Sequence, residues 1–282
     1  MILFVDKLTN IDFSYLDHHR GILGETLLAN IRLTGELDEQ SMVCDFGHVK
    51  KTMRHWLDTE LDHRLAVPCL SPFIKIDEDG DYLLIQFQLE NDQYIRTRSP
   101  KSSIALINTD VITPESLAAW ASKLLLVHFP SSVARMQLDL VNEDIEGAYY
   151  HYSHGLKKHN GNCQRIAHGH RSRIDIWAND KKSPSLEQFW ANEWHDIYIG
   201  TREDLIQAPS EEGKDYYSFA YKAAQGNFEI TLPKSICYLI DCDSTVELLA
   251  WHIAQRTRQL HPEYFIRVKA FEGIDKGAIA EA

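Results

Sequence analysis

Two stretches of the chain resemble each other: PKSSIALINTDVITPESLAAWASKLL at 100–125 and PKSICYLIDCDSTVELLAWHIAQRT at 233–257. Both begin with Pro-Lys-Ser, continue as a short apolar run ending in Leu-Ile, and pass through an acidic turn. Each then starts a helix at Thr-x-Glu, where Thr113 and Thr245 are the expected N-cap residues. The apolar runs predict strands, and the residues after the caps have the spacing of amphipathic helices.

A fainter match lies upstream, where 13–17 (FSYLD) can be placed on 150–154 (YHYSH) and GETLLANIRL on HGHRSRIDIW. Self-similarity over this length predicts an internal duplication, with one unit at 1–146 and another at 147–282. We expect an α+β fold. Each unit would hold two long antiparallel strands, a helical or looped insert, a helix and a final strand, with the helices on one face of antiparallel sheets. The alternative is chance similarity of two strand–helix segments.

The middles of the two units differ. In the first unit, DFGHVKKTMRHWLDTELDHRL (45–65) predicts an amphipathic helix capped by Asp45. No equivalent helix is evident in the second unit, where 201–218 has the pattern of a loop. An Asp-Gly turn between apolar runs predicts a β-hairpin over 73–97. The insert at 69–99 has no assigned role.

Composition excludes several classes of protein. The 282 residues include 29 basic and 41 acidic ones, a net charge of −12, which argues against a general nucleic-acid binder. No apolar run is long enough to span a bilayer, and the N-terminus lacks the basic start of a secretory signal. The five cysteines are few and odd in number, which favours a reducing cytoplasm over a disulfide framework.

A metal site is indicated where histidines cluster. His168 and His170 alternate by two, so on a strand both side chains point to one face. His154, on a neighbouring strand, would complete a three-histidine site. Three imidazole nitrogens suit zinc and leave one position open, as in catalytic rather than structural sites. The alternative for each histidine is a surface or hydrogen-bonded core residue.

Cys163 differs from the other cysteines in its setting. Between 147 and 174 there is no acidic residue and there are five basic ones, which would favour a thiolate able to act as base or nucleophile. The same stretch could attract an anionic substrate such as a phosphate ester, or could be a solvated basic loop. In the first unit, Asp62 precedes His63, and a carboxylate can raise the basicity of an imidazole. Adjacent residues rarely bond each other, so a surface histidine at a helix end is the simpler interpretation.

Together these residues resemble the 6-pyruvoyl-tetrahydropterin synthase and 6-carboxytetrahydropterin synthase superfamily, which has the tunnelling (T-fold) architecture. Its members show F-S-x-x-H, a Cys shortly before HGH, D-F-x-x-L-K, L-D-H, T-x-E-N and V-x-V-x-E motifs. The matching segments here are YHYSH at 150–154, Cys163, HGH at 168–170, Asp45-Phe46, LDH at 61–63, Thr245-Val-Glu247 and VKAFE at 268–272.

The resemblance implies a zinc-dependent lyase. His154, His168 and His170 would hold zinc, Cys163 would be the base, and Asp62 and His63 its proton-transfer partners. Glu272 would grip the guanidine-like edge of a pterin, and Thr245 and Glu247 would line its pocket. The expected substrate is 7,8-dihydroneopterin triphosphate and the product 6-carboxy-tetrahydropterin, on the path to 7-deazapurines such as queuosine. A 6-pyruvoyl product and a non-catalytic zinc- and pterin-binding paralogue are the alternatives.

The motifs are divided between the two units, whereas one ordinary family member carries all of them. The second unit has the histidines, the cysteine and Glu272. The first has Asp62 and His63, with Asp17 in place of the first histidine and Glu143 as a weaker pterin anchor. Because family sites form between neighbouring units, we expect a composite site and a homo-oligomer whose sheets close into a β-barrel.

Overall fold

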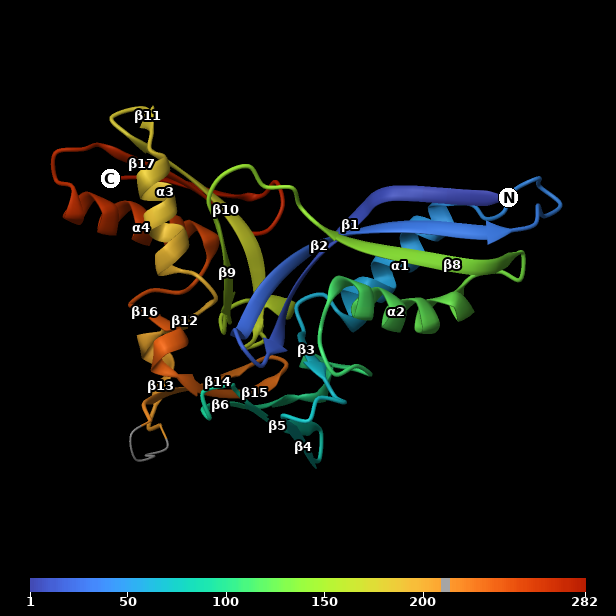
Figure 1. Ribbon diagram of the computed structural model, residues 1–282, viewed down its shortest axis with the longest axis horizontal. Helices are drawn as coiled ribbons and strands as arrows, with labels where there is room; N and C mark the ends of the chain where they lie inside the picture. Colours follow the sequence, from blue (N-terminus) through green and yellow to red (C-terminus); the bar gives the residue numbers. More distant parts are fainter. Residues whose placement is uncertain (209–213) are drawn as a thin grey trace.

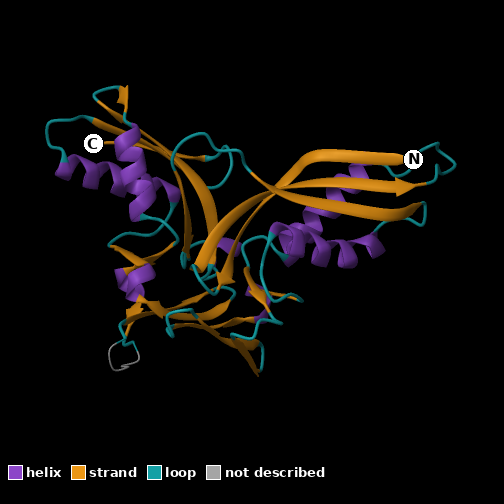
Figure 2. Cartoon of the chain, in the orientation of Figure 1, coloured by secondary structure: helices purple, strands orange, loops and turns teal. Residues whose placement is uncertain are grey.

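The structure, a computed structural model, describes residues 1–208 and 214–282, which form three β-sheets with helices packed against them. The first half of the chain (1–146) lies at one end and the second half (147–282) at the other, joined below by a shared sheet (Figure 1). Helices cover the outer faces of the two large sheets (Figure 2). No helix among the described residues is long and apolar enough to span a membrane.

The elements follow one another in two similar series. The first half contains β1 (Ile2–Asp17), β2 (Gly21–Gly35), α1 (Phe46–Glu60), β3 (Leu65–Pro68), β4 (Ile74–Asp79), β5 (Tyr82–Gln88), β6 (Tyr94–Pro100), β7 (Ile104–Ile107), α2 (Pro114–Leu125) and β8 (Val133–Asn142). The second half contains β9 (Tyr149–His154), β10 (His168–Ala178), β11 (Lys181–Lys182), α3 (Pro184–Glu193), β12 (Ile197–Thr201), β13 (Leu205–Ile206), β14 (Tyr216–Ala223), β15 (Gly226–Pro233), β16 (Cys237–Ile240), α4 (Val246–Leu260), β17 (Ile266–Phe271) and β18 (Gly277–Glu281).

The two large sheets repeat the same strand order. One runs β7-β3-β1-β2-β8 and the other β16-β12-β9-β10-β17, with β18 added at its edge. The expected helix starts are present: Thr113, Thr245 and Asp45 each accept a hydrogen bond from a backbone N–H three residues later. Each half therefore has the two long strands, the insert, the helix and the final strand expected from its sequence.

Two expectations are wrong. The sheets are mixed rather than antiparallel, because β1 pairs with β3, and β3 with β7, in parallel, as do β9, β12 and β16. The second half also has a helix equivalent to α1: α3 begins at Pro184 and buries Leu186, Trp190 and Ala191. Its ten residues give a weaker periodic pattern than the fifteen of α1.

The predicted loop at 201–218 contains β13 and the start of β14, and 209–213 lie outside the described residues.

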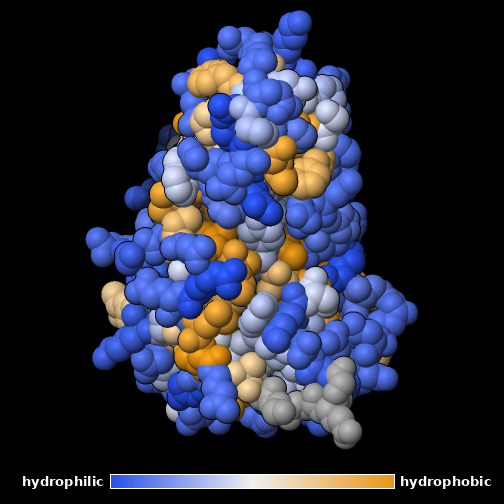
Figure 3. Space-filling view, turned by 90° about the vertical axis from the view of Figure 1, so that its left-hand side faces the viewer, coloured by the Kyte–Doolittle hydropathy of each residue, from blue (hydrophilic) through white to orange (hydrophobic). Residues whose placement is uncertain are grey.

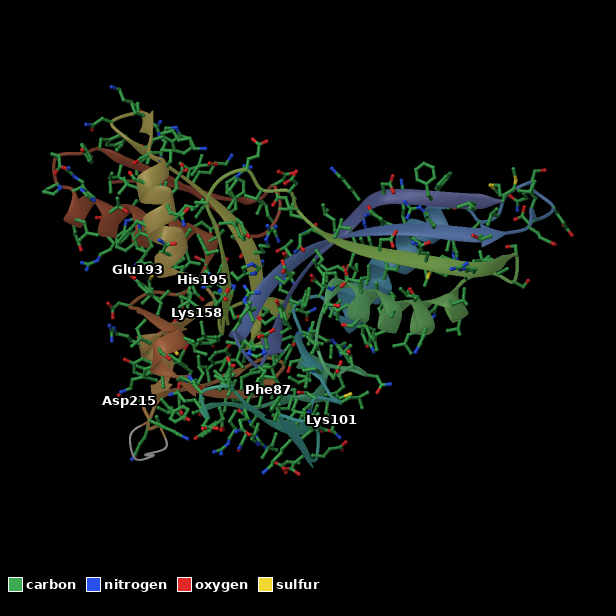
Figure 4. All side chains as sticks on the ribbon, viewed as in Figure 1. Phe87, Lys101, Lys158, Glu193, His195 and Asp215 are labelled. Atoms are coloured by element: carbon green, nitrogen blue, oxygen red, sulfur yellow. The ribbon has the colours of Figure 1, made fainter. Side chains whose placement is uncertain are left out.

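A third sheet joins the two halves. Its order is β13-β14-β15-β6-β5-β4, so the predicted hairpin, seen as β4 and β5, continues through β6 into β15 of the second half. A buried apolar cluster lies against this sheet and draws on both halves, including Ile22, Phe87, Ile166 and Phe219 (Phe87 is labelled in Figure 4). The halves consequently share a core and form one body.

The strand register aligns the two halves residue by residue. Ser14 pairs with Gly24 on one side and Leu65 on the other, and Ser153 pairs with Gly169 and Tyr198. Leu65 in turn pairs with Ile104 and Tyr198 with Cys237, and each of these follows a Pro-Lys-Ser segment by the same number of residues. Ser14 and Ser153 are therefore equivalent positions, as are Gly24 and Gly169.

This register corrects the alignment of the long strands made from sequence. The match of 13–17 with 150–154 is shifted by two residues, and the match of GETLLANIRL with HGHRSRIDIW is shifted by one. The position of His154 is taken by Tyr15 rather than Asp17. Leu23 and Glu25 occupy the positions of His168 and His170. Leu140 pairs with Ala29 as Ala270 pairs with Ile174, so Asn142, not Glu143, stands where Glu272 stands in the second half.

The face that carries α3 and α4 has a band of apolar residues (Figure 3). Phe189, Trp251 and Leu260 are among the exposed large apolar side chains of these helices. That several copies of the chain assemble into a closed β-barrel stays a prediction.

Candidate metal centre and active site

The three predicted ligand histidines converge at one end of the β9–β10 pair. His154 is the last residue of β9 and is paired with His168, the first of β10, while His170 follows on the same face. All three are at most 1% exposed, and their ligand nitrogens lie within 4.8 Å of one another. The alternating spacing therefore places His168 and His170 on one face of the strand, as predicted.

The donor atoms of these histidines fit a metal ion. His154 Nδ1 lies 3.0 Å from the Ser244 hydroxyl and His168 Nδ1 lies 3.1 Å from the Arg165 carbonyl. The Nε2 atoms of all three histidines are buried without a hydrogen-bond partner among the described residues. Burial lowers the pKa of His154 and His168 well below the ordinary value, which keeps them neutral. Three buried imidazole nitrogens without other partners, close to one another, are a donor set that can hold a metal ion.

Asp62 and His63 form a pair at the turn between α1 and β3. His63 has a positive φ of 55°, which brings its Nδ1 back onto the Asp62 carboxylate. The expectation that these neighbours do not bond each other is therefore wrong. Burial lowers the pKa of His63, but hydrogen bonds to Asp62 and Cys163 outweigh this effect and raise it to about 10.

Cys163 connects this pair to the histidines. The ligand atoms of His63, Cys163 and His168 lie within 4.8 Å of one another, and the rings of His63 and His168 are 5.1 Å apart. Arg165 reaches across and donates to the backbone carbonyls of Asp62 and His63, at 3.3 Å each. Both parts of the divided motif set therefore meet within one chain.

Lys157 and Lys158, two of the basic residues around Cys163, are paired with acids. Lys157 contacts Asp204 at 2.7 Å and Glu203 at 3.0 Å, and Lys158 contacts Asp243 at 2.8 Å (Lys158 is labelled in Figure 4). These carboxylates come from later segments of the chain. The acid-free stretch around the cysteine thus acquires acidic partners from elsewhere in the fold.

Of the residues expected to bind substrate, Glu272 lies beside the histidines, and Thr245 and Glu247 lie at the start of α4. The Glu272 carboxylate is 3.8 Å from His170 Nε2 and 4.0 Å from Lys276 Nζ, at the end of β17. Thr245 caps α4 and follows Ser244, whose hydroxyl contacts His154. Glu247 lies in the first turn of this helix. The start of α4 is thereby fixed beside the histidines.

Sequence reasoning missed Asp12, a buried carboxylate in β1 that is 2% exposed. Its Oδ1 lies 3.2 Å from His170 Nδ1 and its Oδ2 lies 2.9 Å from Lys276 Nζ. Its backbone N–H donates to the Asp62 carboxylate at 2.9 Å, and its carbonyl accepts from His63 N at 2.6 Å. The one sequence signal is an acidic residue between Ile11 and Phe13 in a predicted buried strand.

Part of the chain is similar to known proteins. Residues 14–144 match the family model described as 6-pyruvoyl tetrahydropterin synthase. This stretch of the chain is therefore similar to that family. The matched residues include Asp62 and His63 and end before His154.

Two proteins related to this chain are named putative 6-carboxy-5,6,7,8-tetrahydropterin synthase. The protein of Pyrococcus horikoshii is 26% identical, and that of Pyrococcus abyssi 24% identical, over 128 residues. Each alignment covers 45% of this chain and 73% of the relative.

Among solved structures, the 6-pyruvoyltetrahydropterin synthases of Plasmodium vivax and Plasmodium falciparum are similar, with sequence identities of 20% and 12%. Each match covers 52% of this chain and 93% of the other, with a TM-score of 0.43.

Proposed function

We propose that the chain is a zinc-dependent pterin synthase acting on 7,8-dihydroneopterin triphosphate, with 6-carboxy-5,6,7,8-tetrahydropterin as product for 7-deazapurine synthesis such as that of queuosine. The observation that carries this proposal is the meeting of His63 and Cys163 with the three buried histidines. The names of the two Pyrococcus relatives support the reaction class.

The site belongs to a chain of two tandem T-fold units, 1–146 and 147–282. The repeated strand order of the large sheets supports this division. One end of the interface between the units holds the three histidines together with Cys163, Asp62 and His63. The opposite end has Tyr15, Leu23 and Glu25 at the positions equivalent to the histidines.

Each group would have a separate task. His154, His168 and His170 would hold zinc, which when bound would polarise the hydroxyl groups of the substrate side chain. Cys163 would remove a proton from the substrate. The pKa of His63 is raised to about 10, so its imidazole is protonated at neutral pH and lies in contact with Cys163. Asp62 fixes the imidazole through its Nδ1 and balances that charge.

Glu272 would orient the substrate. Its carboxylate lies next to His170 and is partly exposed, with 24% of its side chain accessible. A carboxylate can accept two parallel hydrogen bonds from the amino-pyrimidinone edge of a pterin. Thr245 and Glu247, at the start of α4, would complete the pocket wall.

Two alternatives are separated by the product. Cys163 is separated from HGH by one residue more than in the 6-carboxy-forming enzymes that the chain resembles, and by one residue fewer than in the 6-pyruvoyl-forming ones. Because the spacing lies between the two types, a 6-pyruvoyl product is the second candidate. A paralogue that binds zinc and pterin without turnover is the third. A metal assay alone does not separate these, because all three would bind zinc.

The decisive experiment is incubation of the zinc-loaded full chain with 7,8-dihydroneopterin triphosphate, followed by mass analysis of the pterin product and assay of free triphosphate. Triphosphate, acetaldehyde and the 6-carboxy product are expected. The 6-pyruvoyl mass would support the second candidate. If protein with stoichiometric zinc released no triphosphate, the enzymatic proposal would be wrong.

A further inference from the structure

Asp12 lies where the first half of the chain meets the metal centre of the second. Its carboxylate is buried on β1, with Oδ1 3.2 Å from His170 Nδ1. The Thr26 hydroxyl donates to the same oxygen at 2.6 Å, and Lys276 Nζ lies 2.9 Å from Oδ2. The carboxylate is thus held from both sides with one oxygen 3.2 Å from His170 Nδ1, a buried nitrogen that has no other hydrogen-bond partner among the described residues.

We propose that Asp12 is a positioning residue that fixes His170 with Nδ1–H donated to the carboxylate and Nε2 directed to the metal. The inference rests on the proposed metal site and deepens it. Carboxylates that accept the distal N–H of a ligand histidine fix its tautomer and orientation and increase its basicity. Here the carboxylate comes from the half that contributes none of the three histidines, so full metal affinity requires that the halves be docked.

At the opposite end of the interface an acid and a histidine also face each other. There the histidine takes the position equivalent to Asp12, and the acid takes the position equivalent to His170. By the strand register His151 is equivalent to Asp12, and Glu25 is equivalent to His170. His151 Nδ1 lies 3.9 Å from Glu25 Oε2 and 2.8 Å from the carbonyl oxygen of Gly24. An acid and an imidazole therefore face each other across the interface at both ends.

Only the pair with the histidine on β10 adjoins the three-histidine set, because Tyr15 and Leu23 replace the other two histidines at the opposite end. Glu25 is 8% exposed, so it matches Asp12 in burial and in crossing the interface. Glu25→Gln therefore neutralises a buried acid of the same interface away from the three histidines, and it shows what that change alone does to zinc affinity.

The test compares zinc affinity in Asp12→Asn and Glu25→Gln full-length chains, measured by competition with a chromophoric chelator. The Asn side chain keeps the shape of Asp but loses the charge. We expect Asp12→Asn to weaken zinc binding by ~10–100-fold, and Glu25→Gln to bind as the wild type does. Cobalt-loaded Asp12→Asn should also show an altered ligand-field absorption spectrum, which loss of interface stability alone would not produce.

If Asp12→Asn does not fold, Thr26→Val removes the hydroxyl that anchors Oδ1 while preserving shape, and a smaller loss of zinc affinity with the same spectral change is expected. Wild-type affinity and spectrum in the folded variants would overturn the inference, as would equal losses in Asp12→Asn and Glu25→Gln. Wild-type protein that binds no zinc would instead overturn the metal-dependent function itself, together with the inference, so the two failures are distinguishable.

Discussion

The side-chain hydroxyls of Ser14 and Ser153, which occupy equivalent positions in the two halves of the chain, hydrogen-bond each other at 2.7 Å. The equivalent glycines Gly24 and Gly169 are also in contact, since a Cβ on Gly169 would lie 2.6 Å from Gly24 Cα. Contact between equivalent residues is the mark of a two-fold interface, normally formed by two subunits. Here a single chain forms it, and this interface brings His63 to Cys163.

Gly24 is the most constrained position of this interface. A Cβ there would lie 1.8 Å from the Tyr152 carbonyl oxygen and 2.3 Å from His170 N, both backbone atoms. We expect Gly24→Ala to lower the free energy of unfolding by about 3 kcal/mol or more, measured by denaturant titration. Gly80→Ala is the control, because no atom lies within 4 Å and only its φ of +59° opposes a side chain, at about 1 kcal/mol. Equal losses in the two variants would contradict the close approach.

The composite site is expected to act within one chain. His63→Ala and Cys163→Ala should each lower kcat by ~10²–10⁴-fold, as for loss of a proton-transfer group. Because both side chains contact each other in the same chain, co-expressing the two variants should restore no activity. Wild type co-expressed with the double variant shows whether mixing itself changes the rate. Recovery of turnover in the mixture would mean that the site forms between chains, and an active His63→Ala variant would exclude the composite site altogether.

Glu25 gives the interface a pH dependence. Burial raises the pKa of Glu25 to about 7 from 4.5 despite nearby arginines, so the folded state favours the protonated acid. Stability is therefore present below the ordinary carboxyl pKa and is lost as the pH rises towards 7. We expect Glu25→Gln to gain stability relative to wild type between pH 5 and pH 8, by at most about 3 kcal/mol. Thermal unfolding at both pH values measures this, and a gain that does not grow with pH would refute it.

Arg20 and Asp196 join the halves at the end of the interface opposite the three-histidine cluster. The guanidinium donates two hydrogen bonds of 2.7 Å to the carboxylate, which is 8% exposed. Because the geometry is bidentate and partly buried, we expect a coupling free energy of about 1–3 kcal/mol in a double-mutant cycle of Arg20→Ala and Asp196→Ala. Additive losses in the denaturant titrations would show that the pair contributes no coupling. Zinc affinity should be unaffected, which separates this contact from Asp12.

The local features of the chain were predictable from sequence because they depend on neighbouring residues. The caps at Thr113 and Thr245, the hairpin at 73–97, and the placement of His168 and His170 on one strand face follow from side-chain chemistry and from the period of a strand. The two Pro-Lys-Ser segments predicted a repeat, and the strand order of the two large sheets agrees with it, although the fainter match upstream did not give the observed strand register. Register depends on pairing with other strands, and β3 and β12 fixed it only in the folded sheets.

The tertiary structure decided which residues meet. No local sequence pattern links Asp12 to His170 or His63 to Cys163, because in each pair one residue comes from the first half of the chain and the other from the second. The bond between Asp62 and His63 required the positive φ of His63, and Lys157 found its acidic partners on a distant segment. The sequence by itself determined the elements and the kinds of functional group present. Packing of two equivalent surfaces across Gly24 and Gly169 determined their arrangement, because only close backbone contact brings both halves of the site within bonding distance.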